Sequence, residues 1–267
     1  MLTRKDEITV HTLASGSEGN CMVLSAGKIH LLVDAGISVR RIVAGLASIG
    51  LKPADLSAVV VSHEHSDHIK GVQPLAEKFN LQVYGIGYSA GHMMMDWKPL
   101  FENIRVLPEY GNRYIGDVNV ITFPTSHDAS DSTGFRFDWR GSSVGVLTDT
   151  GYVTREAEQV LLGTPLVILE SNYDERMLRE GPYPPFLKKR IAGEKGHLSN
   201  TDAAAFARKL AESGTKQFVI AHVSKENNTE ELIMEAMHKA LEGFDVEVTI
   251  APRKEISQPF KAGKRRG

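Results

Sequence analysis

Four side chains that commonly bind metals lie within six residues, in the segment His63-Glu64-His65-Ser66-Asp67-His68. Neutral imidazole and carboxylate groups are the usual ligands of zinc and of metals with similar preferences. Because only 10 of the 267 residues are histidine, three of them in six positions are not expected in a polar surface loop. His63 and His65 could face one ion while Asp67 and His68 face another about 3.5–4 Å away, as in two-metal hydrolytic sites. The segment therefore predicts a metal centre.

Two ions need more ligands than one segment supplies, and the same pattern recurs further along the chain. Apolar, strand-like runs at 118–123, 144–147 and 218–221 each lead to a ligand-type residue, and these are His127, Asp149 and His222. Loops beyond strand ends often carry functional residues because a rigid sheet positions them. Each residue alone could equally cap or turn the chain. Beside the first motif, the three together predict further ligands.

Strand and helix signals alternate along the chain, which predicts an α/β fold. Strands are expected at 8–13, 21–24, 29–33, 58–61, 82–86, 104–107, 118–124, 133–139, 143–148, 166–170, 217–221 and 246–250. Helical spacing is found around Ile42, Leu46 and Ile49, and Ser199 begins a capping pattern that ends in Asp202. With no linker or repeat inside them, residues 1–252 are interpreted as one domain, followed by a loose, basic tail at 253–267.

The composition excludes several classes of protein. Hydrophobic residues make up 42% and charged residues 24%, which is typical of a globular chain. No run approaches the roughly 18 apolar residues of a membrane span, and the N-terminus shows no secretory pattern. A single cysteine, Cys21, favours the reducing cytoplasm. Since 31 basic residues face 33 acidic ones, any polyanionic partner must be bound by a local patch. The oligomeric state is left open.

With these residues identified, the sequence resembles the metallo-β-lactamase superfamily over nearly its whole length. The matching positions are Asp34, His63, His65, Asp67, His68, His127, Asp149 and His222. Segments 13–21, 170–172, 183–191, 196–200 and 222–228 are similar to the bacterial YycJ/WalJ-like branch of 5′→3′ double-strand DNA exonucleases. The resemblance implies an αββα four-layer sandwich, in which two mixed sheets are flanked by helices.

The resemblance also implies how the ligands divide between two divalent ions, which could be zinc, manganese or iron. One ion would be bound by His63, His65 and His127, the other by Asp67, His68 and His222. Asp149 would bridge the two, and Asp34 would support the His-rich turn from outside the ligands. One departure is Tyr173, which stands where the branch is expected to have histidine. Any role of that histidine would pass to Tyr173 or His197, or be absent.

For a phosphodiester substrate, two cations would hold a hydroxide nucleophile and neutralise charge on the phosphate oxygens. Asp67 is a candidate acceptor for the proton of the attacking water. His197, in the loop Gly196-His197-Leu198-Ser199-Asn200, is the candidate donor to the leaving 3′-oxygen, unless it only supports that loop.

Candidate substrate contacts fall in two regions. Basic residues before His197 could hold a nucleic-acid backbone or form an ordinary solvated face. The loop 15–20 could bind a phosphate or form a tight turn. The candidates in and around these regions are Ser15, Ser17, Asn20, Asn172, Lys188, Lys189, Arg190, Ser199 and Asn200.

Three classes of function compete: a nuclease, for which DNA is preferred to RNA, a hydrolase of small substrates, and a binding protein. A hydrolase of a small ester, thioester or lactam would use the same ions, and an RNA-processing nuclease would share the metal core. A binding protein without catalysis is disfavoured, since such a relic tends to lose ligands and here the ligand pattern is complete.

Overall fold

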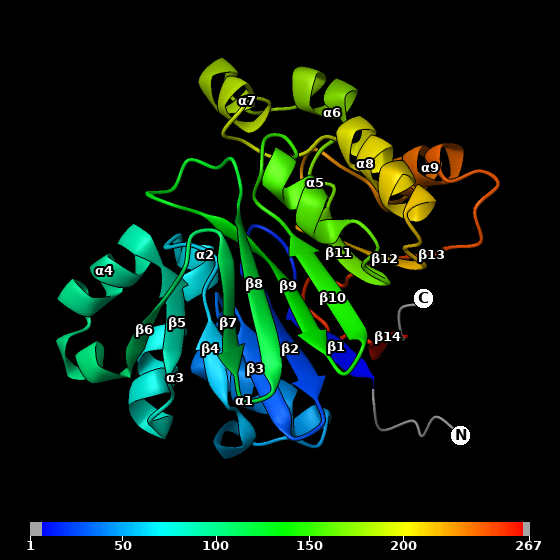
Figure 1. Ribbon diagram of the computed structural model, residues 1–267. Coiled ribbons are helices and arrows are strands. Elements are labelled where there is room, and N and C mark those ends of the chain that lie inside the picture. The colour runs from blue at the N-terminus through cyan, green and yellow to red at the C-terminus, as the bar shows by residue number, and fades with distance from the viewer. Residues whose placement is uncertain (1–6, 264–267) are drawn as a thin grey trace, which may run out of the picture.

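Two seven-stranded β-sheets face each other at the centre of the computed structural model, which describes residues 7–263 (Figure 1). The first sheet has the order β14 (Phe260–Ala262), β1 (Ile8–Ala14), β2 (Cys21–Ala26), β3 (Ile29–Val33), β4 (Ala58–Val60), β5 (Val83–Ile86) and β6 (Ile104–Leu107). The second has the order β13 (Glu247–Ile250), β12 (Gln217–Ala221), β11 (Leu166–Glu170), β10 (Ser142–Leu147), β9 (Thr133–Trp139), β8 (Val118–Pro124) and β7 (Gly111–Ile115). Both are mixed: β3 to β6 and β10 to β13 pair in parallel, whereas the other neighbours are antiparallel.

Helices cover the outer faces of the two sheets (Figure 1). The first half of the chain supplies α1 (Val39–Ser48), α2 (Ser66–Ile69), α3 (Val72–Phe79) and α4 (Gly87–Asp96), with 3₁₀ turns at Pro53–Asp55 and Lys98–Asn103. The second half supplies α5 (Arg155–Leu161), α6 (Glu175–Glu180), α7 (Pro185–Ile191), α8 (Asn200–Glu212) and α9 (Glu230–Ala240). None of these described helices is both long and apolar enough to cross a membrane.

Three apolar clusters join the layers, and the strand sequences show why. In β2, Met22 and Leu24 point into the cluster between the sheets, whereas Cys21 and Val23 pack toward the helices that include α1. A strand buried on both faces is expected to be apolar throughout rather than alternating. The third cluster lies between the second sheet and α5, α8 and α9. The fold is thus the αββα sandwich predicted from the sequence.

All the predicted strands are present, with the largest shift at the end of β2, which runs to Ala26. The predicted cap is confirmed, because the Ser199 side chain accepts a hydrogen bond from the backbone N–H of Asp202 at the start of α8. Two strands, β7 and β14, were not predicted. The expectation of a loose tail is wrong for residues 253–263, because β14 pairs with β1 at the edge of the first sheet. Residues 264–267 lie outside the described residues.

Candidate metal centre

Three of the predicted site residues stand just beyond strand ends, where the backbone adopts positive φ. Asp34 follows β3 with φ 55°, Asp149 comes after β10 with φ 57°, and His222 follows β12 with φ 52°. This left-handed region costs a residue with a Cβ roughly 1–2 kcal/mol. Such conformations persist only where the surroundings hold them, and they gather at functional sites. These three turns therefore mark the edge at which the chemistry is concentrated.

The His-rich segment is folded as a turn that leads into a short helix. After β4, His63 lies in the loop, His65 is the residue before α2, and Asp67 and His68 occupy the first turn of α2. The Asp67 carbonyl accepts a hydrogen bond of 2.8 Å from the backbone N–H of Asn20. A Cβ at Gly36 would lie 1.5 Å from that same oxygen, so only glycine fits there. The turn is fixed by close backbone packing.

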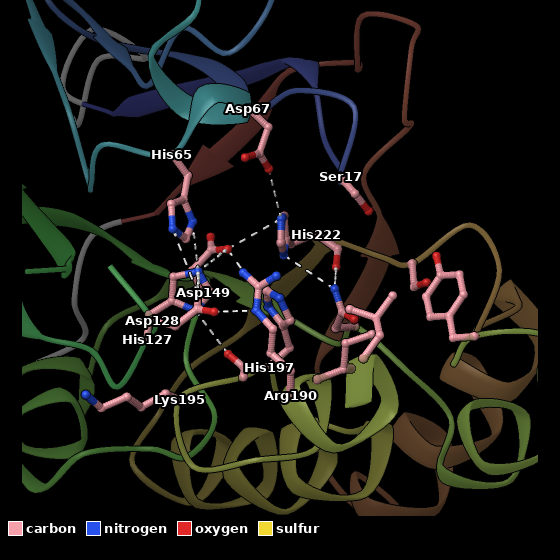
Figure 2. Close-up of a pocket in the computed structure, with 16 residues that line it drawn as sticks. Ser17, His65, Asp67, His127, Asp128, Asp149, Arg190, Lys195, His197 and His222 are labelled. Carbon is pink, nitrogen blue, oxygen red and sulfur yellow. Dashed lines mark hydrogen bonds and ion pairs between the residues drawn. The ribbon is translucent and has the colours of Figure 1, made fainter. Parts of the chain in front are cut away.

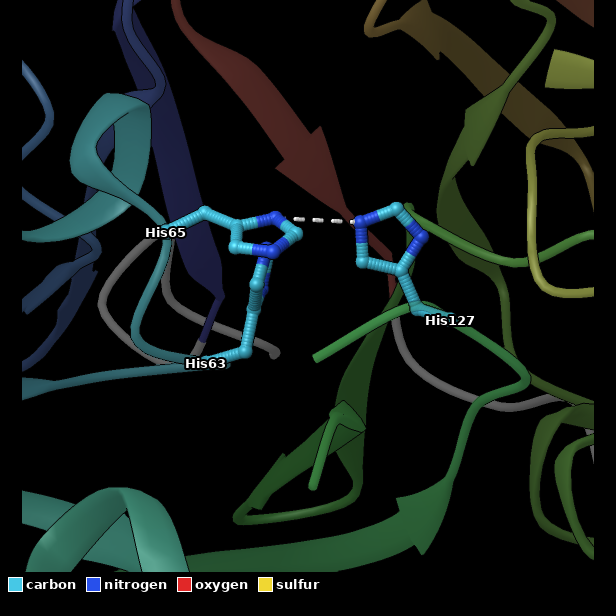
Figure 3. A group of neighbouring side chains, drawn as sticks. All are labelled: His63, His65 and His127. Atoms are coloured by element: carbon cyan, nitrogen blue, oxygen red, sulfur yellow. Dashed lines mark hydrogen bonds between the residues drawn. The ribbon is translucent and has the colours of Figure 1, made fainter. Parts of the chain in front are cut away.

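The two sheets bring their ligand-type side chains together in two adjoining groups. Nitrogen atoms of His63, His65 and His127 all lie within 4.8 Å of one another. Figure 3 shows the three rings turned toward one another. Ligand atoms of Asp67, His68 and His222 form a second group of the same kind.

The carboxylate of Asp149 lies between these groups. Its oxygens are 3.5 Å from His68 Nε2, 3.5 Å from His222 Nε2 and 3.7 Å from His127 Nε2. This is the position that the resemblance expects of a bridging ligand.

The donor atoms fit divalent cations by two independent criteria. Bonds of 2.0–2.2 Å to a tetrahedral ion leave about 3.4 Å between two ligand atoms, which is close to the spacings around Asp149. In addition, His63 Nε2, His222 Nε2 and Asp149 Oδ2 are buried and have no hydrogen-bond partner. Buried polar atoms are nearly always satisfied, so three such atoms in one cluster indicate that another group completes it.

The protonation states of the site residues also favour the binding of cations. Burial lowers the pKa of both His63 and His127, which keeps these imidazoles neutral. Burial also disfavours a charged His68, but the carboxylates of Asp149 and Asp34 outweigh it and raise the pKa of His68 to about 9. Burial disfavours ionised Asp67 as well, yet contact with His222 and the charge of His68 hold its pKa below the usual range. The Asp67 carboxylate therefore stays ionised, and its negative charge favours a bound cation.

Hydrogen bonds on the far side of several of these imidazoles fix their orientation. His68 Nδ1 is 2.7 Å from Asp34 Oδ2, and His127 Nδ1 is 3.2 Å from the carbonyl oxygen of Gly196. Glu170, which is fully buried at the end of β11, contacts His222 Nδ1 and His197 Nδ1 at 2.8 Å each. Metal-binding histidines typically have such partners, which set the tautomer and the direction of the ring.

Comparison with known proteins identifies this arrangement. Residues 30–223 match the model of the beta-lactamase superfamily domain. The chain belongs to the beta-lactamase superfamily. It is 37% identical over 247 residues to exodeoxyribonuclease WalJ of Streptococcus pneumoniae, with 89% of this chain and 90% of the relative covered. It is also 37% identical to exodeoxyribonuclease YycJ of Bacillus anthracis over 243 residues, 88% of this chain and 90% of that one. These relatives place it in the YycJ/WalJ-like branch.

Solved structures agree on the fold at lower identity. The metallo-beta-lactamase fold protein YhfI of Bacillus subtilis has a TM-score of 0.71 at 17% identity, covering 96% of this chain and 100% of that one. The short form of human tRNase Z has a TM-score of 0.66, also at 17% identity, with 94% and 98% covered. As a member of this branch of the superfamily the chain is a hydrolase, which confirms the enzyme class predicted from its sequence.

A cleft opens over this superfamily centre, and we call it the site cleft (Figure 2). Of the predicted catalytic and substrate-binding residues, Ser17, Asp67, Asn172, Arg190 and His197 line it. The other predicted contacts do not line it, and these are Ser15, Asn20, Lys188, Lys189, Ser199 and Asn200.

Most of these other residues support the structure instead. Ser15 accepts a hydrogen bond of 3.0 Å from the backbone N–H of His222, and the Asn20 side chain contacts His68 Nε2 at 3.0 Å. Ser199 caps α8, and the Asn200 side chain is bonded to Ser171 and Asn228 in the interior. We therefore revise their role from substrate contacts to positioning residues.

Three further residues of the 173–190 region also lie outside the lining of the site cleft. Lys188 Nζ donates to the carbonyl oxygen of Arg179, and Lys189 is exposed away from the site cleft. Tyr173 is buried and lies outside the cleft lining, and burial raises its pKa to about 12. If the histidine expected at position 173 has a role in this branch, His197 is the candidate to take it over here, rather than Tyr173.

Two site residues were missed as such by reasoning from sequence. Glu170 belongs to a segment noted for its resemblance to the branch, but its contacts with two histidines depend on the packing of β11 beside β12. Asp128 follows His127, forms an ion pair with Arg190, and lies 3.5 Å from His127 Nε2. The only sign in the sequence that Asp128 belongs to the site was its position next to His127.

Proposed function

We propose that the chain is a dinuclear metal-dependent phosphodiesterase, acting in the cytoplasm as a 5′→3′ exonuclease on double-stranded DNA. The observation that carries the proposal is the placement of Asp149 between two groups of ligand-type side chains, beneath a cleft that also holds Arg190 and Lys195. Cations beside a hydrolytic centre suit a substrate whose backbone is anionic.

In this proposal the ligands divide as the resemblance implies. His63, His65 and His127 would hold one divalent ion and Asp67, His68 and His222 the other, with Asp149 shared. Such ions, when bound, lower the pKa of a shared water toward neutrality and offset charge on the phosphate oxygens. Zinc, manganese and iron all suit a mixed set of imidazoles and carboxylates.

In this proposal two side chains of the cleft move protons. Asp67 lines the cleft, its side chain is 27% exposed and it is ionised, so it is the proposed acceptor for the proton of the attacking water. Glu170 is ionised because contacts with His197 and His222 outweigh its burial and hold its pKa below the usual range. An ionised carboxylate only accepts, so the N–H at Nδ1 of His197 donates to Glu170. In the doubly protonated imidazole, Nδ1–H would stay on Glu170 while Nε2–H passes its proton to the leaving 3′-oxygen, which leaves a neutral ring with its remaining N–H at Nδ1.

Support for DNA as the substrate comes from the relatives. Both curated proteins that cover about nine-tenths of this chain are named exodeoxyribonucleases. Arg190 and Ser17 both line the cleft and are the proposed contacts to the strand. RNA and small esters are the substrates to test next if DNA fails.

The deciding experiment uses the manganese-loaded enzyme on duplex DNA labelled at either end. We expect release of labelled mononucleotide from the 5′ end, and its loss in Asp67→Ala and in chelator. Asp245→Ala is the matched control, because Asp245 has a fully exposed side chain and should keep wild-type activity. No cleavage of DNA by protein shown to bind two metals per chain would contradict the proposal.

A further inference from the structure

A second cleft adjoins the site cleft and differs from it in charge. Its lining includes Arg41, Lys225, Arg253 and Lys254, against only two acidic residues, Glu18 and Glu255. The site cleft instead has three aspartates, Asp67, Asp128 and Asp149, against Arg190 and Lys195. Four cations from three separate parts of the chain thus gather beside a centre that is itself acidic.

The two clefts share a wall. Ser17 lines both of them, and Ser224 of the site cleft is flanked in sequence by Val223 and Lys225 of the second. The wall is tied to the metal centre, because the Ser15 hydroxyl accepts from the backbone N–H of His222 at 3.0 Å. A ligand that leaves the site cleft over Ser17 therefore reaches the second cleft directly.

The cations of the second cleft are positioned, yet only weakly neutralised. Arg253 donates to the carbonyl oxygen of Ser224 at 2.7 Å, and Arg41 to that of Lys254 at 3.2 Å; neither bond removes positive charge. Lys254 pairs with Glu18 at 2.9 Å and Lys225 with Glu226 at 3.9 Å, but these four side chains are between 47% and 71% exposed. Exposed pairs of this kind contribute little free energy. A phosphate can therefore compete for these cations.

We propose that the second cleft binds backbone phosphates of the same nucleic-acid strand whose end occupies the site cleft. This inference rests on the proposed function. A strand carries one phosphate per 3.4 Å or so, so a strand that leaves the site cleft over Ser17 brings its neighbouring phosphates to the second cleft. A small phosphodiester ends inside the site cleft and gains nothing from the second one. The second cleft thus makes the enzyme prefer a polynucleotide over a small diester.

The test compares two substitutions of opposite charge. Lys225→Ala removes a cation whose side chain is 71% exposed, and Glu18→Gln removes the carboxylate that competes for Lys254. Lys239→Ala, an exposed lysine on α9 that lines neither cleft, is the matched control. For each manganese-loaded variant, kcat/KM is measured on a 20-base-pair duplex and on bis(4-nitrophenyl) phosphate over a range of salt concentrations.

We expect Lys225→Ala to lower the ratio of the two kcat/KM values about 3–10-fold, and to reduce the salt slope for DNA by about 1. Glu18→Gln should raise the ratio about 2-fold, because it frees a cation for phosphate. Wild-type ratios and slopes in both variants, from an enzyme that cuts DNA, would overturn the inference alone.

If the wild type cleaves no DNA, the proposed function fails and binding decides the inference separately. Fluorescence anisotropy then measures the affinity of each variant for a labelled duplex. Weaker binding by Lys225→Ala and tighter binding by Glu18→Gln would support the second cleft as a phosphate site. Equal binding by both variants and the wild type would refute it.

Discussion

The metal centre and the cationic residues around the clefts are built in opposite ways. His63 is fully buried, Asp149 is 3% exposed, and the far side of each oriented imidazole is hydrogen-bonded. The side chains of Arg190 and Lys254 are 59% and 66% exposed, and their ion pairs face water. The first group is held by the interior of the fold, and the second by its surface.

This difference sets the size of the effects to expect. Charges in a buried site interact at low effective dielectric and are screened little by salt, whereas exposed charges are screened within about 10 Å at 0.1 M salt. Buried residues that touch the ions should therefore matter most, their hydrogen-bond partners less, and the surface cations least.

The largest effect is expected at the centre of the cluster. Asp149→Asn keeps a residue type that tolerates the left-handed backbone but removes the charge between three imidazoles. We expect kcat to fall about 10³-fold, the upper end for the loss of one electrostatic group. Metal content per chain, measured by mass spectrometry, should fall with it. Full activity at full metal content would contradict a bridging role.

The same variant bears on stability. A ligand at 100 times its Kd stabilises a protein by about 2.7 kcal/mol, which corresponds to about 5–10 °C in Tm for a chain near this size. Chelation should therefore lower the Tm of the wild type by several degrees, and that of Asp149→Asn by less. If chelation lowers the Tm of the two proteins equally, Asp149 does not contribute to metal binding.

A smaller effect is expected one contact away from the ions. Glu170→Gln keeps the shape of the side chain but replaces the charge that both His197 and His222 contact at 2.8 Å. Loss of such a partner usually costs 10–100-fold in metal affinity or activity, and we expect a drop of roughly that size in kcat/KM. Restoration by Glu170→Asp at a lower level would show that the charge, rather than the volume, is needed. Wild-type kinetics in the Gln variant would show that the charge of Glu170 has no role in the activity.

The fold was predictable where one strand carries enough signal by itself. The buried runs at 166–170 and 217–221 are apolar along their length and were placed correctly. By contrast, β7 has three exposed residues in five, so its sequence shows no strand period. The three-residue β14 depends on pairing with β1, some 250 residues away in the sequence. Short edge strands are decided by tertiary contacts that a local pattern does not contain.

The ligand-type residues were found for a related reason. They follow strands, so their pattern along the chain was enough to select them, whereas the resemblance to the superfamily supplied their division between two ions. The partners of these residues were harder to find. Asn20 was expected to contact substrate, yet its side chain faces His68. A polar loop residue looks the same in the sequence whether it faces solvent or the interior, and here backbone hydrogen bonds of Asn20 with Asp67 and Gly36 hold it against the His-rich turn.

Asp34 allows charge and backbone strain to be separated. Its carboxylate contacts His68 Nδ1 and accepts from the Ser62 backbone, and its φ is 55°. Asp34→Asn and Asp34→Ala should both lower kcat/KM about 10-fold through the orientation of His68. The Ala variant alone places an unsuitable residue in the left-handed region, at a further cost of about 1 kcal/mol, or about 2–4 °C in Tm. Identical Tm values for the two variants would show that the backbone there is not strained.

The smallest effect is expected among the cations, and a neighbouring pair of residues on α7 measures it. Arg190 lines the site cleft and is paired with Asp128, whereas Lys189 is exposed and outside the lining. A phosphate must displace Asp128 from Arg190, so the net gain is only part of a charge-assisted hydrogen bond, about 1 kcal/mol. Arg190→Ala should therefore raise the KM for DNA about 5-fold at low salt, with kcat unchanged, and this difference should shrink as salt rises. Lys189→Ala should change KM less than 2-fold or so, as expected of a solvated charge. If the two variants change the KM for DNA equally, binding depends on the total charge of α7. Lining the cleft would then give Arg190 no advantage over the exposed Lys189.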